Sequence, residues 1–510
     1  MGIEGQRHAV EAYDPATATR TLASIVLEAL ERRPDAPRDR SAFDDWVAAN
    51  DPDAPAGISR FVLEVWRRRA DLNDSFPGLF LDPAAPARLQ LWAHHFLVAE
   101  TGAPEWLRPS APENITDFTE VATPSDVTMP LLKPGTTLVG YLRATIGLGD
   151  AARRLVRLLE HAGEHVRTVS YDHINAPLTV PLIAPLPSIP DSWVDDLDIV
   201  VLAVNGAEAP RLVRALGRPA LAGRYVIGLW FWELEELSVE MATGFEVVDE
   251  VWVTSTFTAE AIRRAAPERV AVRIVPLGAD GIAIRRQPGG RGRLGIASEA
   301  VVVGTVFDYA SRIERKNPIG LIEAWRLAYP IPDPSARVLF VKSMNGGGFP
   351  DASRSVLAAV GDRPDIVVHD ASLPRTEWNE LEAEFDVVAS LHRSEGYGLT
   401  LLGAMQRGVP VIASAYSGNL AFMTPATAWL VPVTRSELTA SAGPYPAGGV
   451  WAEPDLATAA EMILEVVDGI NSPSVQGRVA RARESVRSLM DGTAGTSFVR
   501  ERLSEIRAQR

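Results

Sequence analysis

A glutamate in a glycine-rich loop is the most specific chemical feature of this 510-residue sequence. Segment 391–400 reads Leu-His-Arg-Ser-Glu-Gly-Tyr-Gly-Leu-Thr, and the apolar run before it predicts a strand. Gly396 and Gly398 would let a ligand approach the backbone closely. A helix is expected over 397–407, and the free N–H groups at a helix start attract phosphate. The pattern therefore predicts a carboxylate, Glu395, beside an anion-binding helix N-terminus.

A group of cations follows another predicted strand. Arg312, Arg315 and Lys316 stand within five residues of one another. Arginine binds two oxygens side by side and lysine acts as a point charge, so this loop is suited to a diphosphate. The alternative is a solvated loop that only caps a helix beginning at Pro318, with Asn317 as the N-cap.

A third motif, Gly147-Leu-Gly149, enters a predicted helix. It suits a ligand-contacting loop of a transferase. Together with Ala152 and Asp172 it also fits a dinucleotide fingerprint, which would mean a nicotinamide or flavin site. Four residues separate the motif from the preceding strand, however, and a purely structural turn stays open as well. His173, which follows another predicted strand, is a candidate proton carrier because histidine titrates near neutral pH.

Segment 395–414 is similar to the C-terminal signature of the family-4 retaining glycosyltransferases, which have the GT-B fold. Other pieces occur in the expected order. Gly147-Leu-Gly149 resembles the glycine loop of the family's first domain, and Arg315-Lys316-Asn-Pro resembles its diphosphate-binding basic loop. The resemblance extends over roughly residues 135–435.

The resemblance implies an enzyme that moves a hexose from a nucleoside diphosphate sugar, UDP- or GDP-linked, to a hydroxyl acceptor. Retention of the anomeric configuration is implied, with no catalytic metal and no cofactor. Glu395 and Lys316 would be catalytic, with His173 as a further candidate. Donor binding would fall to Gly147, Gly149, Arg312, Arg315, His392, Gly396, Tyr397, Gly398, Leu399 and Thr400.

Two departures from the family pattern matter. The family has a second glutamate eight positions after the first, and here that position is Gly403. A carboxylate-to-ribose hydrogen bond contributes about 1.5–3 kcal/mol. The basic loop also has Ser311 where many members carry arginine. A non-catalytic GT-B relative that acts as a binding or scaffold protein therefore stays open. The motif Gly147-x-Gly149 separately keeps open an NAD- or flavin-dependent oxidoreductase.

The elements that would position these residues form two series of short apolar strands alternating with helices. This alternation predicts parallel sheets covered on both faces. The expected fold class is α/β, GT-B, with two doubly wound Rossmann-like domains facing a cleft and an N-terminal, mainly helical extension. The expected strands are 137–142, 165–170, 198–204, 224–230, 250–254 and 272–276, then 301–307, 337–342, 366–369, 386–391, 410–413 and 428–431.

Four parts of the chain are expected. They are a helical extension over 1–130, an acceptor domain over 131–280, a nucleotide-sugar donor domain over 281–470, and a C-terminal helix over 471–510 that crosses back to the acceptor domain. An oligomer formed through residues 1–130 stays open.

The composition narrows the function classes. The chain has no cysteine, which excludes disulfides, thiolate catalysis and cysteine-ligated metals. Its formal net charge of −15 argues against nucleic acid as a partner. No apolar run reaches the ~18 residues of a membrane span, so a cytoplasmic protein is expected, with peripheral membrane contact left open. The resemblance to glycosyltransferases implies a role in carbohydrate biosynthesis.

Overall fold

A computed structural model of the chain describes residues 22–110, 132–171, 196–278 and 286–510, apart from short gaps. The gaps are residues 32, 34, 53, 55–56, 70–71, 73–75, 77–78, 80–84, 145, 217–220, 222 and 287. The described residues fall into two compact units, one helical and one that holds two six-stranded sheets.

The helical unit contains α2 (Leu22–Glu31), α3 (Arg40–Ala48), α4 (Arg60–Arg68) and α6 (Ala85–Thr101). Its core gathers around α4, whose Phe61, Val65 and Trp66 are buried. Arg67 and Arg68 at the end of α4 pair with Glu64 one turn earlier. Arg67 and Arg68 share this one carboxylate, and Arg69, which follows α4, pairs with Glu100 of α6 at 2.6 Å, so each of the three arginines has an acidic partner.

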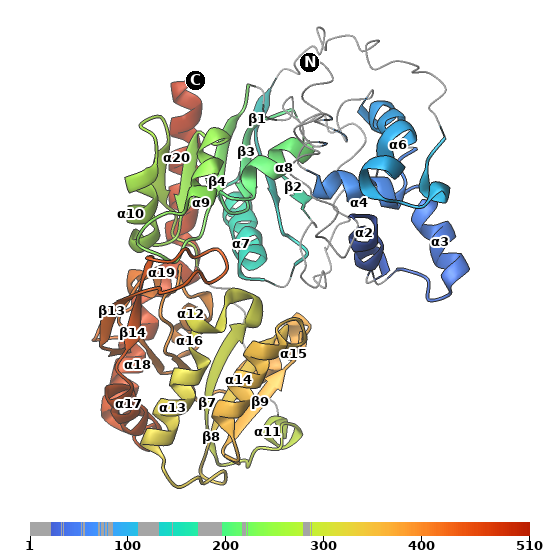
Figure 1. Ribbon diagram of the computed structural model, residues 1–510. Coiled ribbons are helices and arrows are strands. Elements are labelled where there is room, and N and C mark those ends of the chain that lie inside the picture. Colours follow the sequence, from blue (N-terminus) through green and yellow to red (C-terminus); the bar gives the residue numbers. More distant parts are fainter. Residues whose placement is uncertain are drawn as a thin grey trace. The chain divides into compact units, whose positions relative to one another are not determined.

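The first sheet of the other unit has the strand order β2-β1-β3-β4-β5-β6, and Figure 1 labels β1 to β4. We call this sheet with its helices the first lobe. Its elements are β1 (Lys133–Gly140), α7 (Gly147–His161), β2 (Val166–Ser170), β3 (Leu197–Ala203), β4 (Tyr225–Leu229), α9 (Val239–Ala242), β5 (Glu250–Val253), α10 (Thr256–Ala265) and β6 (Ala271–Ile274). Helix α8 (Ala209–Leu216), between β3 and β4 in the sequence, belongs from Pro210 on to the helical unit.

The second sheet is parallel throughout and has the order β12-β11-β10-β7-β8-β9. This sheet with its helices is the second lobe. Its strands are β7 (Val301–Asp308), β8 (Arg337–Met344), β9 (Ile366–Asp370), β10 (Val387–Ser390), β11 (Val411–Ser414) and β12 (Trp429–Val431). Its helices are α11 (Gly290–Arg293), α12 (Ile313–Lys316), α13 (Pro318–Ala328), α14 (Pro350–Val360), α15 (Arg375–Glu382), α16 (Leu399–Arg407), α17 (Leu456–Asp468), α18 (Pro473–Ser485) and α19 (Arg487–Met490).

Hydrophobic cores cover both faces of the second sheet. Val303 of β7 belongs to a core shared with α13, α14 and α17, and its neighbour Val302 belongs to another core shared with α15, α16 and α18. Successive side chains of a strand point to opposite faces, so a strand buried on both sides must be apolar at every position. This explains why the strands of this sheet are short continuous apolar runs.

The second sheet has a switch point, at which the order of its strands reverses. Counted from β7, the order reverses between β7 and β10, because the chain first builds outward through β8 and β9 and then returns to the other side. In open parallel sheets, ligands bind beyond the carboxyl ends of the strands at such a switch point. The segments that follow β7 and β10 carry Lys316 and Glu395, respectively.

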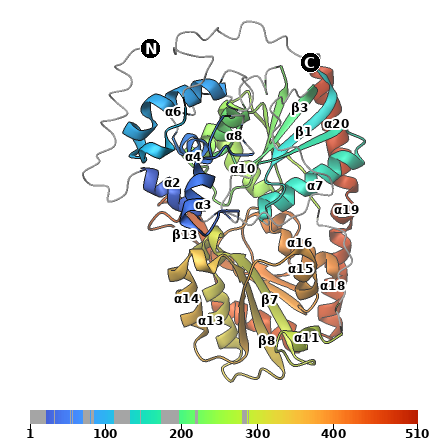
Figure 2. The ribbon, with the colours of Figure 1, turned by 90° about the vertical axis from the view of Figure 1, so that its right-hand side faces the viewer.

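The C-terminal helix α20 (Thr493–Gln509) packs on α7 of the first lobe (Figure 2). Val499, Leu503 and Ile506 join the core of that lobe. Arg502 donates to both carboxylate oxygens of Glu250 at 2.6–3.1 Å, and the Glu250 side chain is fully buried. An apolar face and a buried ion pair therefore hold this helix on the first lobe.

The predicted fold class is confirmed at the level of its strands, since all twelve expected strands occur within a few residues of their predicted positions. The antiparallel hairpin of β13 (Val433–Glu437) and β14 (Val450–Pro454) was not predicted. Within the ranges given above, no helix is long and apolar enough to cross a membrane.

Candidate active site

Glu395 lies at the centre of a charged cluster beyond the ends of β7 and β10. Its carboxylate forms an ion pair with Nζ of Lys316, and its Oε1 lies 3.7 Å from a terminal nitrogen of Arg315. The side chains of all three are at least four-fifths buried. The structure therefore brings together the acidic loop and the basic loop that lie some 80 residues apart in the sequence.

The cluster keeps Glu395 ionised. Burial alone would raise the pKa of this carboxyl, but the charges of Lys316 and Arg315 outweigh burial and lower the pKa to about 2. At neutral pH Glu395 is therefore a carboxylate, which accepts hydrogen bonds and does not donate a proton.

Ser417 and Gly418 hold the backbone of Glu395 in place. The N–H of Glu395 donates to Oγ of Ser417 at 2.8 Å, and the N–H of Gly418 donates to the carbonyl oxygen of Glu395, also at 2.8 Å. A Cβ at Gly418 would overlap the carbonyl of Gly396. Ser417 itself has φ +76°, a strained region for a non-glycine residue, and such strain is typical of functional sites.

The first lobe contributes to the same loop. Oγ of Ser255, the N-cap of α10, donates to the carbonyl of Gly396 at 2.8 Å, and Oγ of Ser394 donates to the carbonyl of Glu233. The acidic loop is thus fixed from both lobes, which leaves the carboxylate of Glu395 little freedom to move.

Helix α16 begins directly after the acidic loop. Gly398, at φ +94°, is its N-cap, and no side chain caps the helix. The N–H groups of Gly398, Leu399 and Thr400 consequently lie at a helix start that a side chain does not occupy. Such a start favours anions through its aligned N–H groups and its dipole.

The two predicted arginines differ in their surroundings. Arg315 is buried, and it donates to the carbonyl oxygens of Ser394 at 2.9 Å and Ser311 at 3.3 Å. Arg312 stacks over the ring of Phe349 at 5.9 Å and makes no hydrogen bond or ion pair through its side chain with another described residue. Arg312 also has φ +68°, which costs of order 1–3 kcal/mol and must be compensated by its surroundings.

Asn317 plays the structural part expected of it. Its side chain accepts from the N–H of Gly320 at 3.1 Å as the N-cap of α13, and it donates to the carbonyl of Leu391 at 2.9 Å. This second bond ties the start of α13 to the end of β10. One loop therefore caps α13 through Asn317 and also contributes Arg315 and Lys316 to the charged cluster.

Two residues that the sequence did not single out complete the cluster. Glu233, which follows β4, has Oε1 at 4.0 Å from Arg315 and accepts a hydrogen bond of 3.0 Å from the hydroxyl of Tyr445. Tyr445 comes from the long loop of the hairpin β13–β14 and packs against Trp232 at 5.7 Å between ring centroids. Glu233 could have been found in the sequence as an acidic residue just after the end of a predicted strand. Nothing in the sequence marks Tyr445 as part of the site.

His392 and Tyr397 lie in the interior. The ring of His392 is fully buried, with Nδ1 at 3.0 Å from Ser390 and Nε2 at 3.1 Å from Asn419, and burial lowers its pKa. The ring of Tyr397 packs edge-on against Phe422 at 5.2 Å. Both side chains point into the core, so donor contacts at these two positions would come from the backbone.

The two glycines of the β1–α7 connection have different surroundings. A Cβ at Gly149 would lie 2.5 Å from the carbonyl oxygens of Tyr141 and Ala144, whereas a Cβ at Gly147 would meet nothing within 4 Å. Close packing of the turn therefore accounts for Gly149, and Gly147 faces open space. His173 lies outside the described residues.

Gly403 occupies the second turn of α16, where the resembling family carries its second glutamate. A Cβ there would lie 3.2 Å from a terminal nitrogen of Arg407, and Arg407 pairs with Glu382 at 2.9 Å. The position is therefore open enough for a small side chain, and a cation lies beside it.

A further buried cation lies at the end of β8. Nζ of Lys342 donates to the carbonyl oxygens of Ser343 and Ala371 at 2.5 Å, and burial lowers its pKa to about 8. Asp370 accepts from Oγ of Ser343 at 3.0 Å and from the N–H of Gly346 at 3.1 Å. This network fixes the ends of β8 and β9 next to the basic loop.

The described residues contain no group of three or more histidine, aspartate or glutamate side chains arranged to hold a metal ion. The charged side chains around Glu395 are of both signs: the cations Arg315 and Lys316 lie beside the carboxylates of Glu233 and Glu395.

These observations define the protein first as an α/β protein with two Rossmann-like lobes and a charged site at the switch point of the second. No family model matches the chain, and no curated protein matches it. Among solved structures, a glycosyltransferase from Rickettsia africae is similar over 73% of this chain and 98% of its own, with a TM-score of 0.51 and 13% identity.

Two further structures cover the chain to a similar extent. Sucrose-phosphate synthase from Thermosynechococcus elongatus is similar over 74% of this chain and 99% of its own, with a TM-score of 0.49 and 17% identity. HepE from Anabaena, solved with UDP, is similar over 74% of this chain and all of its own, with a TM-score of 0.48 and 16% identity. The two six-stranded sheets and the similarity to the Rickettsia africae glycosyltransferase identify the fold of the two lobes as the GT-B fold, and the predicted GT-B architecture is confirmed.

Proposed function

We propose that the protein is a retaining glycosyltransferase that moves a hexose from a nucleoside diphosphate sugar, UDP- or GDP-linked, to a hydroxyl acceptor without a metal ion. The observation that carries this proposal is the buried cluster of Glu395, Lys316 and Arg315 at the switch point of the second sheet. The GT-B fold shared with the Rickettsia africae glycosyltransferase and the signature at 395–414 support it.

The positive groups of the site suit a diphosphate. Arg312 has no ion-pair partner among the described residues, and the uncapped start of α16 adds the partial charge of its N–H groups. Lys316 is bound to Glu395, and an arriving phosphate would share it. These groups would offset the charge that develops on the leaving diphosphate, as fixed cations and helix starts do elsewhere.

Glu395 would hold the donor sugar. Because its pKa is about 2, it accepts hydrogen bonds from sugar hydroxyls at every physiological pH. The bond between the anomeric carbon and the diphosphate oxygen would break, and a bond from that carbon to the acceptor oxygen would form on the same face. The proton of the acceptor hydroxyl would pass to the leaving diphosphate.

The experiment is a transfer assay on the purified full chain. Labelled UDP-glucose and GDP-mannose are incubated with a panel of hydroxyl acceptors in the presence of EDTA, and the anomeric configuration of the product is read by NMR. The proposal predicts a glycoside of retained configuration and a thermal shift with UDP or GDP. Stabilisation by NAD but by neither nucleoside diphosphate would favour the oxidoreductase, and nucleotide binding without turnover would favour a binding protein.

A further inference from the structure

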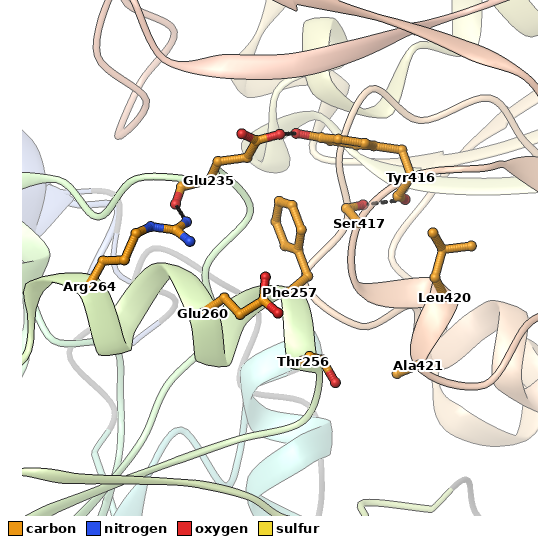
Figure 3. A pocket seen from close by; sticks show the side chains of 9 residues that line it. All are labelled: Glu235, Thr256, Phe257, Glu260, Arg264, Tyr416, Ser417, Leu420 and Ala421. Atoms are coloured by element: carbon orange, nitrogen blue, oxygen red, sulfur yellow. Dashed lines mark hydrogen bonds between the residues drawn. The ribbon is translucent and has the colours of Figure 1, made fainter.

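A cavity lies between α10 of the first lobe and the turn η6 (Gly418–Ala421) of the second (Figure 3). Its volume is about 420 Å³, which is within the usual range for small-molecule sites. Its walls are formed by Glu235, Thr256, Phe257, Glu260, Arg264, Tyr416, Ser417, Leu420 and Ala421.

One side of this cavity is apolar. The rings of Phe257 and Tyr416 meet edge to face at 5.4 Å between centroids. Leu420 is 43% exposed, and Ala421 lies beside it. These groups offer a surface on which the C–H face of a ligand would stack.

The other side is polar, and part of it is already fixed. The hydroxyl of Tyr416 donates to Oε1 of Glu235 at 2.8 Å, and Arg264 donates to the carbonyl of Glu235 (Figure 3). The other carboxylate oxygen of Glu235 forms an ion pair with Arg435. By contrast, the side chains of Glu260 and Thr256 make no hydrogen bond with another residue that the structure describes. The polar rim therefore has one carboxylate that its neighbours orient and one carboxylate and one hydroxyl that remain available.

The cavity is joined to the charged cluster through one residue. Ser417 lines the cavity, and its Oγ accepts the hydrogen bond from the backbone of Glu395. A ligand in the cavity would therefore contact the same turn that holds Glu395.

Resting on the glycosyltransferase function proposed above, we propose that this cavity is the acceptor subsite and that it takes a neutral carbohydrate. A sugar ring has an apolar C–H face and a rim of hydroxyls, which matches one aromatic wall and one carboxylate wall. Carboxylates accept from hydroxyls. Glu235 is paired with Arg435, whereas Glu260 has no ion-pair partner among the residues that the structure describes. A phosphorylated or otherwise anionic acceptor would therefore be disfavoured beside Glu260, because like charges placed together cost free energy.

The test is a binding titration of the full chain, followed by saturation-transfer NMR. The probes are methyl α-glucoside and methyl α-mannoside, with glucose 6-phosphate as the anionic counterpart. Each is titrated in the presence of saturating UDP or GDP. The neutral glycosides are expected to bind, and the phosphorylated sugar is expected to bind more weakly than either.

Two substitutions of residues that line the cavity test whether the glycosides bind there. Glu260→Gln, at an exposed helical position, and Phe257→Ala are each expected to weaken glycoside binding by about tenfold. Glu268→Gln is the matched control, because it makes the same change at an exposed position just beyond α10 that does not line the cavity. In none of the three is the dissociation constant of the nucleoside diphosphate expected to change.

The proposal is overturned if neither glycoside binds the wild-type chain, or if Glu260→Gln binds both glycosides as tightly as Glu268→Gln does. If the proposed glycosyltransferase function itself is wrong, the result is different, because the wild-type chain would then bind neither UDP nor GDP. Nucleotide binding together with absent glycoside binding thus rejects the subsite alone.

Discussion

Tyr445 and Glu233 are joined by a hydrogen bond of 3.0 Å from the tyrosine hydroxyl to Oε2 of the glutamate. The bond joins the hairpin loop of the second lobe to the segment that follows β4 in the first. The other oxygen of Glu233 faces Arg315, which in turn faces Glu395. A guanidinium is therefore shared by two carboxylates, one from each lobe, and each carboxylate limits how much positive charge the site presents.

Glu233→Gln tests this sharing. The amide keeps a hydrogen-bond acceptor for Tyr445 but removes a negative charge beside Arg315. We expect UDP or GDP to bind several-fold more tightly at low ionic strength and the gain to shrink at high salt, because screening weakens charge interactions. Isothermal titration at two salt concentrations measures this. Glu236→Gln, at an exposed position of the same segment, should change nothing. Unchanged or weaker nucleotide binding in Glu233→Gln would refute the electrostatic role.

Lys316→Ala removes the cation paired with Glu395. By analogy with the removal of one transition-state-stabilising group from other enzymes, we expect kcat to fall by about 10²–10³-fold. Steady-state transfer kinetics check this, with Arg354→Ala on the exposed face of α14 as control. A fall of less than about threefold would show that Lys316 does not act on the leaving group.

The predictions from sequence succeeded where one physical rule determines the outcome. Strands such as β7 and β8 must be apolar at every position because helices cover both faces, so the sequence marks them clearly. The order of the strands in the sheet determines where the loops that follow them lie. The parallel sheet brings the loops of Lys316 and Glu395 to the same edge, whereas the direct ion pair between the two side chains was not predicted.

Features that depend on contacts between distant loops could not be predicted from the sequence. Neither the hairpin β13–β14 nor the position of Tyr445 could be predicted, because the hairpin strand 433–437 is mostly exposed and polar. Residue type also does not show burial. His392 is a plausible ligand contact in sequence, yet its ring lies in the core. Likewise, nothing in the sequence marks the positive φ of Ser417.

The depressed pKa of Glu395 predicts how stability depends on pH. The folded-state pKa of about 2 lies below the ~4.3 of an unfolded glutamate, so the carboxylate stabilises the fold above pH ~4.3 and loses that effect as the pH falls toward 2. The thermal midpoint of wild type should exceed that of Glu395→Gln by a constant amount from pH 6 to 8, and this difference should shrink below pH ~4.5. A constant excess down to pH 3 would contradict the assigned pKa.

Arg502→Ala tests the attachment of the C-terminal helix. The variant leaves the fully buried Glu250 without its guanidinium, and breaking a buried pair in this way costs about 3–5 kcal/mol. Urea unfolding of the variant measures the loss. Arg500→Ala, on the same helix but exposed, should lose less than about 1 kcal/mol. Equal losses in the two variants would mean that the ion pair does not hold α20.

Glu395→Gln gives the most direct measurement of the central claim, because it keeps the shape of the side chain and removes only its charge. Transfer of hexose from UDP-glucose or GDP-mannose is measured for wild type and variant, together with the dissociation constant of the nucleoside diphosphate. We predict that transfer falls by at least about 100-fold, while the nucleoside diphosphate binds as tightly as before or more tightly. Undiminished transfer by the variant would contradict the assignment of the charged cluster as the site of sugar transfer.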